Sequence, residues 1–151
     1  MLMQMKVERA AKQDMRSIAE CWVGLRMHQR ERQGGRRPSL QGMMRQVEGN
    51  FERPHCHYFV AKEAGKVIGA ALVRLRKGGR SACLSRAYVV PSHRRQGVMR
   101  KLESIVVDFL RQRGLSTLDL TVVPYNEEGM ATWPALGYRP TKIVMAKQIK
   151  S

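Results

Sequence analysis

The chain has 151 residues and a formal net charge of +16 at neutral pH. Hydrophobic residues make up 43% of it, which is enough for a core and excludes an intrinsically disordered protein. Its three widely spaced cysteines fit neither a secreted disulfide framework nor a zinc ribbon, and no apolar run is long enough to cross a membrane. The first five residues lack the charged and apolar regions of a signal peptide, so we expect a cytoplasmic protein of one domain, residues 1–151.

The basic residues are unevenly distributed. Between Glu63 and Glu103 the chain has ten Lys and Arg residues and no acidic one. Such a field attracts polyanions, whether nucleic acid, an anionic membrane or a phosphorylated cofactor, and a solvated basic surface is the plain alternative. An aromatic content of 6% offers few stacking platforms, which argues against nucleic acid.

Hydrophobic periodicity and turn residues predict the elements in chain order. A helix is expected over residues 15–25, with Asp14 at its cap or first turn, and a second over residues 40–47 after a Gly-Gly-Arg-Arg-Pro break. Three strands follow in hairpin order, and the strands expected in this half are residues 5–9, 58–62, 66–75 and 82–90.

The second half begins with an amphipathic helix over residues 98–110, and Gly114 suits the left-handed stop after it. A strand is expected over residues 117–123, a short helix between Asn126 and Pro134, and a last strand over residues 138–149. A strand–helix–strand unit favours a parallel pair. The result is a mixed α/β fold with a mostly antiparallel sheet and helices on both faces.

The turn between the strand at 82–90 and the helix at 98–110 carries the chemistry. Residues 91–97 read Pro-Ser-His-Arg-Arg-Gln-Gly, so two arginines and a glycine precede the helix. The first amides of a helix point outward, unpaired, at the positive end of its dipole, and Gly97 has no Cβ to block an anion. The residues alone predict a phosphate site, with a plain helix start as the alternative.

This stretch resembles a known family. Residues 94–99 resemble the Gln/Arg-x-x-Gly-x-Gly/Ala loop of the GNAT N-acetyltransferase superfamily, and Val89-Val90-Pro91 precedes them at the family's spacing. Asn126 and Leu136-Gly137-Tyr138 are similar to its Asn…Leu-Gly-Phe/Tyr signature, and the element order agrees over nearly the whole chain. The resemblance implies a fold with one splayed parallel strand pair. It also implies transfer of an acetyl group from acetyl-CoA, or another acyl-CoA, to a primary amine by direct attack.

The resemblance further implies where the cofactor binds. The pantetheine arm would pair with the backbone of Ala87, Tyr88 and Val89, and the Val89 amide would stabilise the oxyanion. Met99 stands where the family's loop usually ends in Gly or Ala. The residues implied to hold the pyrophosphate and to line the far wall are Arg94, Arg95, Gln96, Gly97, Val98, Met99 and Arg100, with Asn126 and Trp133.

The positions that usually supply the base and the acid differ here. Ser85 and Arg86 lie on the strand where many members have a carboxylate, and Thr121 stands in place of a Glu on the next strand. Trp133 replaces the usual Tyr acid, and an indole has no labile proton. A water chain helped by Tyr125 or Ser85 would then serve. The alternative is a non-catalytic module of the same fold that binds CoA or another polyanion.

Partners follow from the remaining features. Arg30, Arg32, Arg36 and Arg37 fall where the family forms one lip of the acceptor site, so they suit a small-molecule or peptide amine with negative charge; a solvated loop is the alternative. His55 and His57 share a strand face without further ligands, so we expect no metal. The apolar last strand predicts a homodimer through its edge, while the net charge favours a monomer.

Overall fold

The computed structural model describes residues 4–150, with the backbone alone for residues 32 and 33. The chain divides into two compact units, of which the first ends at Leu120 and the second begins at Thr121. The absence of a signal peptide was expected from residues 1–5, and residues 1–3 of these lie outside the described residues. The single domain expected over residues 1–151 stays a prediction.

The first unit is built on a five-stranded sheet with the order β1-β2-β3-β4-β5. Antiparallel pairs join the first four strands, and β4 and β5 run parallel. The mixed sheet and its parallel pair are therefore confirmed. The strands are β1 (Met5–Arg9), β2 (Cys56–Glu63), β3 (Lys66–Leu75), β4 (Ser81–Val89) and β5 (Thr117–Asp119).

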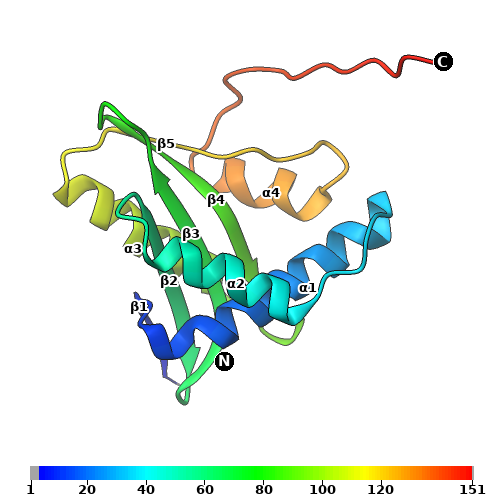
Figure 1. The fold of residues 1–151 in the computed structure, drawn as a ribbon. Coiled ribbons are helices and arrows are strands. Elements are labelled where there is room, and N and C mark those ends of the chain that lie inside the picture. The colour runs from blue at the N-terminus through cyan, green and yellow to red at the C-terminus, as the bar shows by residue number, and fades with distance from the viewer. Residues whose placement is uncertain (1–3, 151) are drawn as a thin grey trace. The chain divides into compact units, whose positions relative to one another are not determined.

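Three long helices cover the two faces of this sheet (Figure 1). Helices α1 (Met15–Gln33) and α2 (Leu40–Phe51) pack on one face, and α3 (Val98–Gln112) packs on the other. Both α1 and α2 extend beyond their predicted ends. Because apolar residues define only the buried stripe, periodicity misses the polar last turns of a helix.

The carboxylate of Asp14 fixes the start of α1. It is buried, accepts the Ala11 amide at 2.8 Å and pairs with the Lys62 ammonium of β2 at 2.9 Å. It makes no side-chain cap to α1 itself. Asp14 therefore ties the helix start to the sheet, a role that its expected place at the cap did not reveal.

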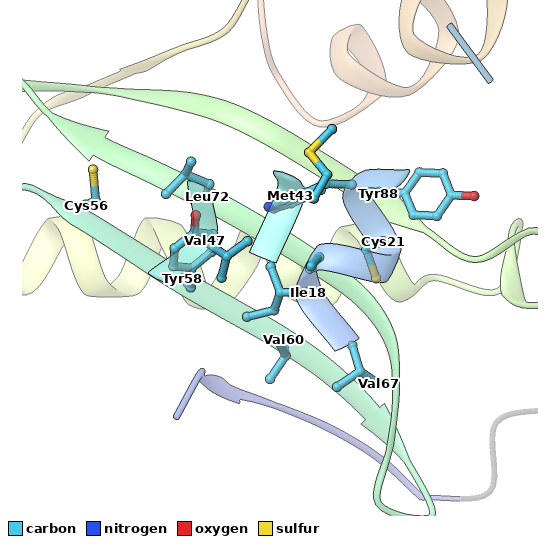
Figure 2. Close-up of a cluster of buried hydrophobic side chains, with 13 residues drawn as sticks. Ile18, Cys21, Met43, Val47, Cys56, Tyr58, Val60, Val67, Leu72 and Tyr88 are labelled. Atoms are coloured by element: carbon cyan, nitrogen blue, oxygen red, sulfur yellow. The ribbon is translucent and has the colours of Figure 1, made fainter. Parts of the chain in front are cut away.

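The core has a layer on each face of the sheet. Figure 2 shows the layer under α1 and α2, where Ile18, Val47 and Leu72 meet side chains of β2 and β4. On the other face, α3 buries a row of residues at helical spacing, namely Val98, Leu102, Val106 and Leu110. A Cβ at Gly69 would lie 3.1 Å from the Leu102 side chain, so this glycine lets α3 approach β3.

The second unit contains helix α4 (Glu127–Ala135). The Asn126 side chain caps it by accepting the Gly129 amide at 3.1 Å, as expected, and the helix ends one residue after Pro134. The Trp133 ring meets the Tyr138 ring edge-on, with centroids 5.6 Å apart.

One predicted strand is shorter than expected, and another is absent from the described residues. The strand expected over residues 117–123 ends at Asp119, and no strand forms over 138–149 in the part of the chain that the structure describes. Ile143 is 86% exposed, and Val144 is similar. An apolar alternating segment becomes a strand only when another strand pairs with it, and the sequence pattern does not supply that partner.

Candidate functional site

The candidate site extends from a β-bulge in β4 to the start of α3. Leu72 pairs with Arg86 and Val73 pairs with Leu84, so Ser85 is an extra residue on β4. The parallel pairing with β5 ends at Cys83, just before this bulge. Because a bulge bends its strand and interrupts the ladder, β4 runs on from Ser85 with no pairing to β5.

The backbone of β4 beyond the bulge offers hydrogen-bonding groups on the β5 side. The Val90 amide donates to the Ile68 carbonyl of β3 at 2.9 Å. In an antiparallel ladder, the backbone N–H and C=O groups of every second residue point toward the partner strand. The groups of Tyr88 and Val90 therefore point toward β3, and those of Ala87 and Val89 point away from it. The expected pairing groups of Ala87 and Val89 thus point away from β3, whereas the backbone of Tyr88, which was also expected to pair with the cofactor, points toward β3.

The loop after β4 is held by side chains on both sides of it. The His93 Nε2 atom lies 3.1 Å from the Glu63 carboxylate at the end of β2, and the Ser92 hydroxyl lies 2.8 Å from His93 Nδ1. The Arg94 Nε donates to the Val89 carbonyl at 2.9 Å, and its guanidinium lies 5.2 Å from the centre of the Tyr88 ring. Arg94 therefore hydrogen-bonds to the Val89 carbonyl, and the Val89 amide points away from β3.

The start of α3 has the geometry of an anion site. Gly97 adopts φ +82°, the left-handed region that favours glycine, and is the N-cap. No side chain caps this end within the described residues, and the first bond of the helix runs from the Lys101 amide to the Gly97 carbonyl at 3.1 Å. A Cβ at Gly97 would meet no atom within 4 Å, so the space beside this residue is unobstructed. These outward amides fit the pyrophosphate of CoA.

The other loop residues differ in their exposure. Arg95, Gln96 and Arg100 are exposed, Met99 is half-buried and Val98 is buried against the sheet. Arg95 has φ +61°, a conformation that side-chain-bearing residues seldom adopt. Such strain persists only where surrounding contacts enforce it, and it gathers at binding sites. The two arginines therefore differ: Arg94 holds the loop, and Arg95 stands in solvent.

Beyond the bulge, the side chains of Arg86 and Tyr88 lie on the sheet face under α1 and α2. Arg86 donates to the Gln46 side chain at 3.2 Å and lies 5.8 Å from the centre of the Trp22 ring. Burial raises the pKa of the Tyr88 phenol, which reaches α1 beside Gly24. Ser85 is exposed, and its hydroxyl donates to the Cys83 sulfur at 3.9 Å.

The remaining expected site residues belong to the second unit. Asn126 is half-buried and serves as the α4 cap, Trp133 is half-buried, and Tyr125 is 48% exposed. Their contact with the cofactor stays a prediction.

Of the two histidines considered for a metal, His57 lies in β2 and His55 lies just before it. His57 is buried, and its Nδ1 accepts a hydrogen bond from Arg9 at 2.9 Å while the ring meets Phe109. Among the residues that the structure describes, no group of three or more His, Cys, Asp or Glu side chains is placed to hold a metal ion. None of the helices in residues 4–150 has the length and apolar character needed to cross a membrane.

Comparison with known proteins agrees with this geometry. The model of the acetyltransferase (GNAT) family matches residues 22–138, which include β4, the loop, α3 and the Leu-Gly-Tyr signature. The chain belongs to the GNAT acetyltransferase family. The resemblance drawn from the loop and the signature is thus confirmed.

Relatives of this GNAT protein extend the comparison. N-acetyltransferase family 8 member 2 of Rattus norvegicus is 28% identical over 106 residues, which cover 68% of this chain and 47% of the rat protein. The chain spans about half the length of the curated relative that it matches.

Solved structures share the fold over nearly the whole chain. A tetramutant of a Bacillus halodurans protein aligns with a TM-score of 0.84 at 16% identity, over 95% of this chain and 99% of that one. The aminoglycoside N-acetyltransferase AAC(6')-Iy, solved in complex with CoA, aligns with a TM-score of 0.75 at 22% identity, over 98% and 96% of the two chains. These likenesses confirm the fold class.

Sequence reasoning missed the contacts that hold the GNAT loop in place. The Glu63–His93 contact joins residues 30 positions apart, and nothing local signals it. The bulge at Ser85 also could not be predicted from the sequence, because no glycine stands at that position. The one available signal was Arg94 itself, which follows Val89 closely enough in sequence to turn back on it.

Proposed function

We propose that this protein transfers an acetyl group from acetyl-CoA, or another acyl group from its CoA thioester, to a primary amine. The observation that carries the proposal lies in one stretch of the first unit. The backbone groups of Ala87 and the amide of Val89 point away from β3, and after the loop of residues 90–96 the uncapped start of α3 follows at Gly97. Backbone groups for an amide-containing arm and amides for a diphosphate therefore follow one another along the chain.

The thioester supplies an activated carbonyl carbon when acyl-CoA is bound. The amine nitrogen attacks this carbon, a C–N bond forms, and the C–S bond breaks to release the CoA thiolate. The Val89 amide donates to the developing oxyanion, the role for which its outward direction suits it. The proton lost by the amine passes to water, with Ser85 or Tyr125 assisting. A free thiol has a pKa near 8.5, so its thiolate leaves without a side-chain acid.

Further parts of the proposal rest on the family. Asn126 and Trp133 line the far wall of the cofactor site, and Arg95, Gln96, Met99 and Arg100 surround the pyrophosphate. The CoA complex of the aminoglycoside N-acetyltransferase supports acyl-CoA as the co-substrate. We also keep a cytoplasmic location and a protein without a metal.

A homodimer stays a prediction, but it now rests on exposed apolar side chains and not on the edge of a strand. The strand expected to form its edge is absent from the described residues, but Ile143, Val144 and Met145 remain exposed for a second copy. Light scattering that shows only monomer at micromolar concentration would contradict it.

Thiol release tests the proposed reaction. Acetyl-CoA is incubated with the full chain and a panel of small amines, amino acids and peptides with free N-termini, and free CoA is measured. We expect release that depends on both acceptor and enzyme and is lost in a Gly97→Glu variant. If no amine of the panel led to release of CoA, acetyl transfer to these amines would be refuted. Calorimetry would then show whether the protein binds CoA without turnover.

That result would favour the second candidate, a non-catalytic module that binds CoA or another polyanion. Its support is the chemistry at the expected base and acid positions. Ser85 and Arg86 replace a carboxylate on β4, and Trp133 has no labile proton. CoA binding at micromolar affinity without turnover for any amine would establish it.

A further inference from the structure

Arg86 is a half-buried cation whose contacts are all to neutral groups. Its guanidinium donates to the Gln46 side-chain oxygen at 3.2 Å and to the Met43 sulfur at 3.8 Å, and it lies over the Trp22 ring. No carboxylate of the described residues forms an ion pair with it. A charge withdrawn from water without an opposite partner is destabilising in the free protein.

Two further arginines increase this positive charge. Arg86 is directly opposite Leu72, so it lies on the sheet face under α1 and α2, and Arg74 lies two residues on from Leu72 on that face. Burial, and then Arg74 and Arg26 of α1, lower the pKa of Arg86. Three cations from α1, β3 and β4 thus face one region.

The position of Arg86 connects this charge with the proposed reaction. It follows the Ser85 bulge and precedes Ala87, so it sits at the start of the stretch of β4 that does not pair with β5. A strand rises about 3.3 Å per residue, which places Arg86 and Val89 about 10 Å apart along β4. An acceptor whose amine and anionic group are several bonds apart can reach both.

We propose that Arg86, with Arg74 and Arg26, binds a carboxylate or phosphate group of the acceptor and so selects anionic amines. The inference rests on the proposed acetyl transfer and adds the class of acceptor to it. A planar guanidinium presents paired N–H donors to carboxylate or phosphate oxygens, and the bound anion supplies the charge that Arg86 lacks. Gln46 holds the guanidinium in place for that contact.

The test compares matched acceptors with and without the anion. The carboxylate arm uses glycine, β-alanine, γ-aminobutyrate and 5-aminovalerate against their amides, and the phosphate arm uses O-phosphoethanolamine against ethanolamine. Thiol release gives kcat/KM for each, and calorimetry measures binding of the same compounds in the presence of CoA. The variants are Arg86→Gln, Arg86→Lys and Arg74→Gln. Arg45→Gln, an exposed arginine of α2, is the matched control.

We expect the wild-type protein to prefer at least one anionic acceptor over its neutral partner by tenfold or more in kcat/KM. Arg86→Gln should raise KM at least tenfold with kcat little changed, Arg86→Lys should keep part of the preference, and Arg45→Gln all of it. Arg74→Gln, at an exposed position, should lower the preference without unfolding the chain. The arm that shows the preference identifies carboxylate or phosphate.

Equal use of anionic and neutral amines by the wild type, or a preference unchanged in Arg86→Gln and Arg74→Gln, would overturn the inference and leave the acetyl transfer standing. Arg86-dependent binding of the anionic compounds without thiol release would do the reverse. Neither binding nor release would refute both.

Discussion

The segment from β4 to α3 and the segment from Thr121 onward use their side chains differently. In the first segment, β4 lies in the sheet and α3 buries one row of side chains against it. Long-range contacts such as Glu63–His93 hold the loop between them. From Thr121 onward, a capped short helix and one ring contact are followed by apolar side chains exposed to solvent. In the first segment, tertiary contacts hold the backbone of the loop in place, whereas the contacts described in the second segment join residues close in sequence.

The comparison can be tested by removing one side chain from each segment. Leu102 is fully buried between α3 and the sheet, so Leu102→Ala should lower the free energy of unfolding by about 2–5 kcal/mol. Ile143→Ala, at an exposed position, should change it by less than about 0.5 kcal/mol. Urea denaturation measures both. Comparable losses would mean that residues 138–150 pack in solution.

The packed unit should also respond to acid through His57. Burial, and then Arg9 and Arg113, lower the pKa of His57 to about 4. The unfolded chain, with an ordinary pKa near 6.5, binds the proton first as pH falls. The contribution of His57 to stability is therefore fully present above about pH 6.5, and up to about 3 kcal/mol of it is lost between pH 6.5 and pH 4.

Denaturation midpoints across this range measure the effect. His57→Leu should flatten the pH dependence, and His55→Leu, the exposed neighbour, should preserve it. A slope that survives in His57→Leu would place the acid sensitivity elsewhere in the chain.

The loop itself is tested at its glycine. Gly97→Glu forces a side chain into a φ of +82° and places a carboxylate over the first amides of α3. CoA binding should weaken at least tenfold, or about 1.4 kcal/mol. Gly49→Glu is the control, because Gly49 lies exposed in α2 with no atom near its Cβ position. An unchanged dissociation constant in folded Gly97→Glu would refute the anion site.

The smallest expected effects concern the second unit. Trp133→Phe should mainly alter CoA affinity, and Trp133→Tyr should add little to turnover, because the thiolate needs no acid. Thiol release and calorimetry separate the two quantities. A hundredfold loss of turnover in Tyr125→Phe with intact CoA binding would instead show that a side-chain acid is required.

Local chemistry made most of the first unit predictable. The 3.6-residue period gave α1 and α3, Ala64-Gly65 gave the β2–β3 hairpin, and Gly97 marked the start of α3. These signals succeed because a helix stripe, a tight turn or a left-handed glycine is determined by residues close in sequence.

Features set by distant partners were not predictable. The bulge at Ser85 shifts the alternation of β4, so a single period cannot assign all its faces. Residues 138–149 have a strand-like composition and lack a strand in the described structure. The neutral surroundings of Arg86 arise from α1, α2 and β4 together, and no motif contains them.

Gly24, in the middle of α1, has a consequence for how mutations spread through this protein. A glycine there makes the helix about 1 kcal/mol less favourable than alanine would. A Cβ, however, would lie 2.6 Å from the Tyr88 hydroxyl, and the same Tyr88 ring lies against the Arg94 guanidinium. A methyl group at position 24 would therefore displace the Tyr88 ring. The displaced ring would in turn disturb Arg94, which donates a hydrogen bond to the Val89 carbonyl. A substitution that improves the helix in isolation is expected to disturb a loop far from it in sequence.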